Sequence, residues 1–124
     1  MPTMAQAAFA TLRHSLVVTL LGEVESEGWG TLQRELLERV AHSRAHGVIL
    51  DVSAVRVLDA QDAEALRRTV MMFGLLGARC IVAGLSMSLV ASLTELDLTL
   101  TEVETASSVE TALDRIAPKA RHAV

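Results

Sequence analysis

The sequence predicts an α/β domain with a mostly parallel central sheet of about five strands, an N-terminal hairpin and four to five helices. Short apolar runs rich in β-branched residues, such as residues 48–50, are typical of strands that are buried on both faces of a parallel sheet. These runs alternate with segments whose apolar residues recur at helical spacing, which indicates strand–helix–strand units. The length of 124 residues favours a single domain.

The chain begins with a predicted hairpin, whose strands cover residues 7–12 and 15–21 on either side of a tight connection. Residues 22–30 are acidic and contain glycine, which predicts a loop. One apolar stripe then predicts a first helix that packs on the sheet. The stripe consists of Trp29, Leu32, Leu36, Leu37 and Val40. Gly47 is expected to end this helix and to begin the central strand.

The stretch from residue 47 to 68 is the centre of the predicted domain. Its apolar strand ends at Asp51, and Asp59 stands directly before a helical pattern expected over about residues 60–73. Asp59 is therefore the predicted N-cap, and Asp62, three residues later, approximates a capping box. The start of this helix should lie at the carboxyl edge of the sheet, where open α/β folds usually place function.

The rest of the chain continues the alternation. We expect a buried strand at 79–83, a third helix from Ser86, an edge strand at 98–103 and a last helix capped by Ser107 or Ser108. Pro118 should end that helix, which leaves residues 118–124 as a flexible tail.

The composition argues against several classes of function. Apolar residues make up 51% of the chain and charged residues 21%, as in a compact soluble protein. The net charge is −4 and the cationic residues are scattered, which argues against nucleic acid as a partner. The longest strongly apolar run, residues 70–76, is too short to span a membrane, and no signal peptide is visible. We therefore expect a cytoplasmic protein without a membrane partner.

The sequence contains few residues that could carry out catalysis or bind a metal. Cys80 lies in an apolar run and is expected to be a small buried side chain. His42 and His46 have a spacing that could hold a metal, but they also suit the last turn of a helix. Asp51 and Asp59 could form an acid/base pair, or could simply end a strand and cap a helix. We favour the structural interpretation of each, and expect no enzymatic activity, metal or cofactor.

Two blocks of the sequence resemble a known family. The segments GVILDVSAVRVLDA, at residues 47–60, and CIVAGLSMSLVASLTELDL, at residues 80–98, are similar to STAS domains, the fold of bacterial anti-sigma factor antagonists. The resemblance covers nearly the whole chain, so that residues 1–124 form one STAS domain, and it points to the stressosome scaffold branch. It implies a protein–protein interaction module whose partners are R-type STAS paralogues and a switch serine kinase, and which forms a homodimer or a larger hetero-oligomer.

The resemblance also implies a phosphorylation site. In the family, the residue after the helix-capping Asp is a phosphorylated Ser or Thr, and that position is Ala60 here. Alanine has no hydroxyl, either because this paralogue naturally lacks the acceptor or because a serine has been replaced. A second family hydroxyl corresponds to Ser92. The partner-binding surface implied around these positions consists of Asp59, Gln61, Asp62, Ser86 and Ser88.

A second class of function stays open at this stage. In a small-ligand binding STAS-like domain, the helix start at residues 60–62 would hold a nucleotide or a lipid head group. The acidic residues that crowd this helix start argue against an anionic ligand.

Overall fold

The computed structural model describes residues 7–97 and 102–116. The elements follow the predicted strand and helix order. They are β1 (Ala7–Leu12), β2 (Ser15–Leu20), α1 (Gly28–Ala41), β3 (Gly47–Asp51), α2 (Ala60–Leu75), β4 (Arg79–Ala83), α3 (Met87–Glu95), β5 (Glu104–Ala106) and α4 (Val109–Ile116).

The five strands form one sheet in the order β1-β2-β3-β4-β5, and only β1 runs antiparallel to its neighbour. The strand predicted to be central, β3, is in the middle. Its Leu50 pairs with Val18 of β2 and Val82 of β4. The α/β class and the mostly parallel sheet with an N-terminal hairpin are thereby confirmed.

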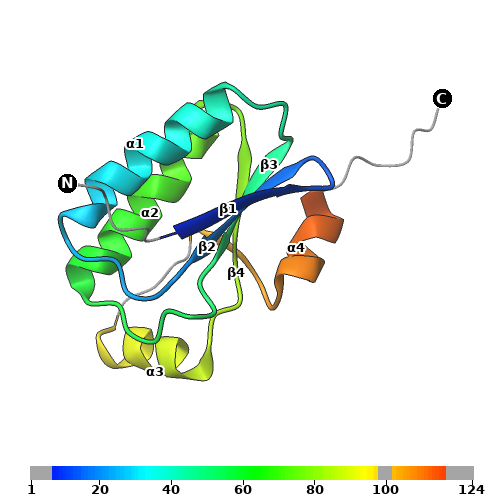
Figure 1. Ribbon diagram of the computed structural model, residues 1–124. Coiled ribbons are helices and arrows are strands. Elements are labelled where there is room, and N and C mark those ends of the chain that lie inside the picture. Colours follow the sequence, from blue (N-terminus) through cyan, green and yellow to red (C-terminus); the bar gives the residue numbers. More distant parts are fainter. Residues whose placement is uncertain (1–6, 98–101, 117–124) are drawn as a thin grey trace.

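The helices cover the sheet unequally. Figure 1 shows α1 and α2 side by side on one face, α4 on the other face, and α3 beyond the carboxyl ends of the parallel strands. The larger core lies between the sheet and the α1–α2 layer, and includes Leu36, Leu50 and Phe73. A smaller core lies under α4 around Ile49 and Ile81. Because β3 and β4 contribute to both cores, their side chains are apolar without alternation, as a buried parallel strand requires.

The limits of α1 differ from the prediction at both ends. The helix begins at Gly28, inside the predicted loop 22–30, because the Gly28 amide donates to the Glu25 carbonyl at 2.7 Å and Trp29 is buried by the first turn. It ends at Ala41, so Gly47 does not terminate it. Gly47 is instead needed inside β3, since a Cβ atom there would lie 2.8 Å from the Arg79 carbonyl oxygen.

The end of α2 also lies beyond the predicted position. The helix runs through Gly74 to Leu75. Gly77 makes the turn, with a left-handed φ of 79° that an L side chain rarely adopts. Gly74, by contrast, lies inside the helix and does not end it.

The edge strand was predicted at 98–103, and this prediction is wrong for the part that the structure describes. Residues 98–101 lie outside the described residues, and β5 is formed by Glu104–Ala106. Pairing of Ile81 with Glu104 sets the register, and Ala106 packs in the smaller core beneath α4. The following helix is capped by Ser108, whose hydroxyl oxygen accepts from the Thr111 amide at 3.1 Å, in agreement with the prediction.

Candidate functional site

The start of α2 lies at the carboxyl end of the central strand, and an anchored loop holds it there. Val52 and Val55 in this loop are almost fully buried. The Asp51 carboxylate accepts from the Ser53 amide at 3.0 Å, and the Glu23 carboxylate accepts from the Arg56 amide at 2.9 Å. The loop therefore has its own apolar anchors and main-chain hydrogen bonds, which fix the direction in which α2 begins.

A complete capping box closes the first turn of α2, as the sequence predicted. Asp59 Oδ1 accepts from the Asp62 amide at 2.7 Å, and Asp62 Oδ2 accepts from the Asp59 amide at 3.4 Å. Two amides near the helix start are thus satisfied within the chain.

Asp62 has a second role that was not predicted. Its Oδ1 accepts from the indole Nε1 of Trp29 at 3.1 Å, which ties the first turn of α1 to the first turn of α2. The placement of Asp62 on a partner-binding surface stays a prediction. The residue is half-buried, and both its carboxylate oxygens have intramolecular partners. The sequence offered only one signal for this contact, since a buried Trp usually needs an acceptor for its N–H.

We expect the Asp59 cap to contribute measurably to stability. Asp59→Ala removes the acceptor for the Asp62 amide and should lower the free energy of unfolding by about 1 kcal/mol, within a range of about 0.5–2 kcal/mol. Asp59→Asn keeps an acceptor oxygen and should lose much less. Urea unfolding followed by circular dichroism measures both variants. Equal stability of the two would show that the cap does not hold the helix start.

The residues after the cap are open to solvent. Ala60 and Gln61 are exposed. They line a shallow depression of about 340 Å³ together with Glu64, Ala65 and Arg68. These last three residues were not among the predicted site residues, although the i, i+4 spacing of Glu64 from Ala60, of Ala65 from Gln61 and of Arg68 from Glu64 could have indicated them. The side chain of position 60 thus points to the outside of α2, one turn from Glu64.

Glu64 is held by two arginines. Its carboxylate lies 2.7 Å from the Arg67 guanidinium and 3.5 Å from that of Arg68. The hydrogen bond from Arg67 is the main reason why the pKa of Glu64 lies below its ordinary value. Arg67 also contacts Glu102 at 3.3 Å. The outer surface of α2 near position 60 therefore carries both signs of charge, with Glu64 ionised.

The first turn of α3 is capped by a serine. Ser86 is its N-cap, since its hydroxyl accepts from the Leu89 amide at 3.1 Å, whereas Ser88 is exposed one residue into the helix. Nothing in the geometry brings Ser86 or Ser88 into contact with Ala60.

Ser92 is the α3 residue that approaches the start of α2. It is half-buried, and its hydroxyl donates to the Leu58 carbonyl at 3.5 Å, next to the capping Asp59. The structure therefore places Ser92 against Leu58, the residue before the capping Asp59.

The other candidate residues, Cys80, His42 and His46, have neighbours that indicate structural roles. Cys80 is buried, and desolvation raises the pKa of its thiol. His42 Nδ1 lies 2.9 Å from the Glu38 carbonyl at the end of α1, while the His46 ring packs edge-on against His14. Within residues 7–97 and 102–116, no group of three or more His, Cys, Asp or Glu side chains is arranged to hold a metal ion. Among the described helices, none has the length and apolar character to cross a membrane.

The fold and this site define an α/β domain that presents a capped, solvent-exposed helix start next to the carboxyl end of its central strand. Residues 6–112 match the model of the STAS domain family. Because the match covers most of the chain, this protein belongs to the STAS domain family.

The chain is similar to one curated protein and to several solved structures. The chain is 26% identical over 102 residues to RsbT co-antagonist protein RsbRA of Bacillus subtilis, covering 79% of this chain but only 37% of that relative. A solved RsbS variant of Moorella thermoacetica has a TM-score of 0.74 at 23% identity, with 90% of this chain and 95% of that chain covered. A stressosome structure has a TM-score of 0.72 at 23% identity, with 93% and 100% covered. The two solved structures support the fold, and the chain spans about a third of the length of the curated relative.

Proposed function

We propose that this domain is a non-enzymatic, cytoplasmic interaction module that sequesters a switch serine kinase through the surface around the start of α2. The observation that carries the proposal is the exposure of Ala60 and Gln61 directly after a rigid cap. An anchored loop and a capped first turn give a partner a surface that needs no ordering when it binds, which lowers the entropic cost of association.

The residue at position 60 sets how the surface is regulated. A phosphate would add about −1.5 to −2 charge next to Asp59 and one turn from Glu64. Alanine has no oxygen to accept phosphate, so the present chain keeps its unmodified surface in the presence of an active kinase. The domain therefore keeps the kinase bound, because modification at position 60 cannot release it.

Ser92 is the remaining candidate acceptor of the two predicted positions. Its hydroxyl is half-buried against the Leu58 carbonyl, so a kinase could reach it only if α3 moved away from the loop before α2. Phosphate at this residue would break that contact. We therefore propose that modification of Ser92, where it occurs, acts by displacing α3.

The curated relative supports a proposal about larger assemblies. RsbRA is named as a co-antagonist of RsbT. We propose that R-type STAS paralogues of this kind associate with the present chain, and that the complex holds the kinase. A small-ligand function finds less support, because Asp59, Asp62 and the ionised Glu64 would repel an anionic head group at this helix start.

The proposal can be tested by placing a charge at position 60. Ala60→Glu should weaken binding of the serine kinase encoded by a neighbouring gene by about tenfold, because it adds a like charge to an acidic helix start. Ala41→Glu is the matched control, since it adds the same charge at an exposed residue at the far end of α1. Titration calorimetry measures both affinities. Equal affinity of the two variants, or no binding of the kinase by the unmodified chain, would contradict the proposal.

A further inference from the structure

The two edges of the sheet differ in a way that bears on assembly. The β5 edge is a strand of three residues, and its Glu104 is ion-paired with Arg79 at 2.7 Å and with Arg115 at 3.5 Å. The β1 edge is a strand of six residues, AAFATL, without a charge or a proline. Proteins usually protect an edge by shortening it or by placing charges and prolines on it. β5 has such protection, and β1 lacks it.

The hairpin geometry fixes which main-chain groups of β1 face outward. Arg13 and His14 form a two-residue turn, both with positive φ, and Leu12 pairs with Ser15. In such a turn the closing pair is hydrogen-bonded, and hydrogen-bonded pairs then alternate along the ladder. The amide and carbonyl groups of Ala7, Phe9 and Thr11 therefore point away from β2. On the opposite side of β2, the His46 amide donates to the His14 carbonyl at 2.6 Å, which agrees with this alternation.

These outward groups are self-complementary. Suppose that a second copy of β1 lies antiparallel to the first, so that Phe9 pairs with Phe9 of the second copy. Ala7 of each copy then pairs with Thr11 of the other. Each of these pairs then exchanges both of its N–H···O bonds. A two-fold axis through Phe9 satisfies every outward group of the strand, and no other partner sequence is needed.

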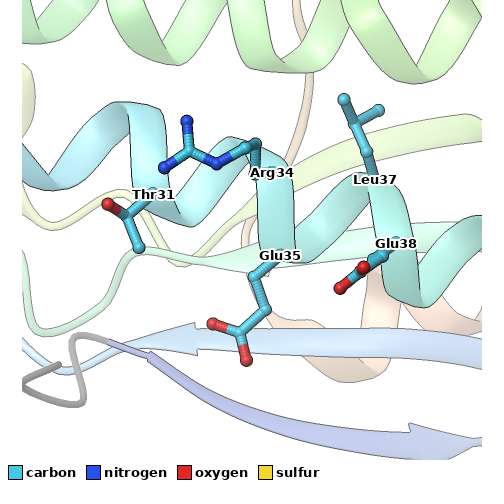
Figure 2. A pocket seen from close by; sticks show the side chains of 5 residues that line it. All are labelled: Thr31, Arg34, Glu35, Leu37 and Glu38. Carbon is cyan, nitrogen blue, oxygen red and sulfur yellow. The ribbon is translucent and has the colours of Figure 1, made fainter. Parts of the chain in front are cut away.

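The surroundings of the edge also suit a second copy. The Arg39 guanidinium covers the Phe9 ring at 3.9 Å from its centroid, and lies 3.4 Å from the Glu35 carboxylate. The exposed flank of α1 lines an open groove of about 700 Å³. Figure 2 shows its side chains, which carry both signs of charge. The groove is lined by Thr31, Arg34, Glu35, Leu37 and Glu38. A two-fold axis brings two such flanks to the same face, so that cations of each copy can meet anions of the other.

The face of β1 opposite Phe9 also leaves room for a second copy of the chain. Ala8 and Ala10 are exposed there and have small side chains, and Leu12 is 47% exposed. Among residues 7–97 and 102–116, no strand pairs with the outer side of β1.

From these observations we propose that β1 is a self-association edge through which two copies of this chain pair antiparallel, so that their sheets become one continuous sheet. This edge lies on the side of the sheet away from β5, and α1 lies between it and α2 (Figure 1). A dimer formed here leaves the start of α2 open, so self-association does not depend on kinase binding and does not compete with it.

Sedimentation equilibrium of the full chain, from about 10 µM to about 1 mM, tests the proposal. The unmodified chain should reach twice the mass of one chain within this range. Thr11→Pro removes one outward amide and leaves the β1–β2 ladder intact, and should raise the dimer dissociation constant at least tenfold. Thr11→Ala is the matched control, since it keeps the amide and should dimerise like the parent.

Two further measurements keep the test decisive. If circular dichroism shows that Thr11→Pro does not fold, Ala7→Pro replaces it, because that residue also has an outward amide. Hydrogen exchange should show protection of the Phe9 and Thr11 amides that rises with protein concentration in the parent chain. A monomer at about 1 mM, unchanged dimerisation of the proline variant, or association only with a STAS paralogue or an extended peptide would overturn the proposal.

Discussion

A Leu50→Asp variant is expected not to fold at room temperature. Leu50 is 2% exposed in the middle strand of the sheet, and pairs with Val18 and Val82 in the larger core. Replacing it removes a buried side chain, at about 2–5 kcal/mol, and leaves a carboxyl group without a partner, at several kcal/mol more. The total is comparable with the entire stability of a typical domain, about 5–15 kcal/mol.

The same substitution at an exposed leucine is the control. Leu75, in the last turn of α2, is 88% exposed, so Leu75→Asp should cost about 1 kcal/mol or less. Thermal unfolding followed by circular dichroism compares the two variants. A soluble Leu50→Asp chain that melts cooperatively near the parent temperature would mean that β3 is not the centre of the core.

An Ala60→Ser variant is expected to become a kinase substrate, whereas the parent chain takes no phosphate at position 60. The position is exposed in the first turn of α2, where serine is tolerated, so stability should change by about 0.5 kcal/mol or less. The phosphate formed would crowd the carboxylates of Asp59 and Glu64. We expect it to weaken kinase binding roughly tenfold or more, while the parent keeps the kinase bound.

Phosphate mapping by mass spectrometry after incubation with kinase and ATP measures this effect. Any residual labelling of the parent should map to Ser92, and Ser92→Ala should abolish it. The Ala60→Ser, Ser92→Ala double variant isolates labelling at position 60. If this double variant stays unlabelled while the kinase modifies another substrate, position 60 is not equivalent to the acceptor of the family.

Features that depend on local chemistry could be predicted from the amino-acid sequence. Apolar runs predicted the buried strands β3 and β4, and helical periodicity predicted α1 and α2. The capping box at Asp59 was readable because its hydrogen bonds connect residues three apart. Ser108, one of the two residues predicted to cap the last helix, could be identified for the same reason. The exposure of Ala60 followed directly from the position of the cap.

Features that depend on contacts between residues distant in sequence could not be predicted in this way. The carboxylate of Asp62 is held by Trp29, 33 residues away, so a residue expected on the surface stabilises the packing of two helices. β5 begins at Glu104 because of its register with Ile81, which a short strand without strong periodicity does not reveal. Gly47 is required by the approach of the Arg79 carbonyl, and not by the end of a helix. In each case a partner remote along the chain supplies the deciding contact, and local patterns carry no information about such a partner.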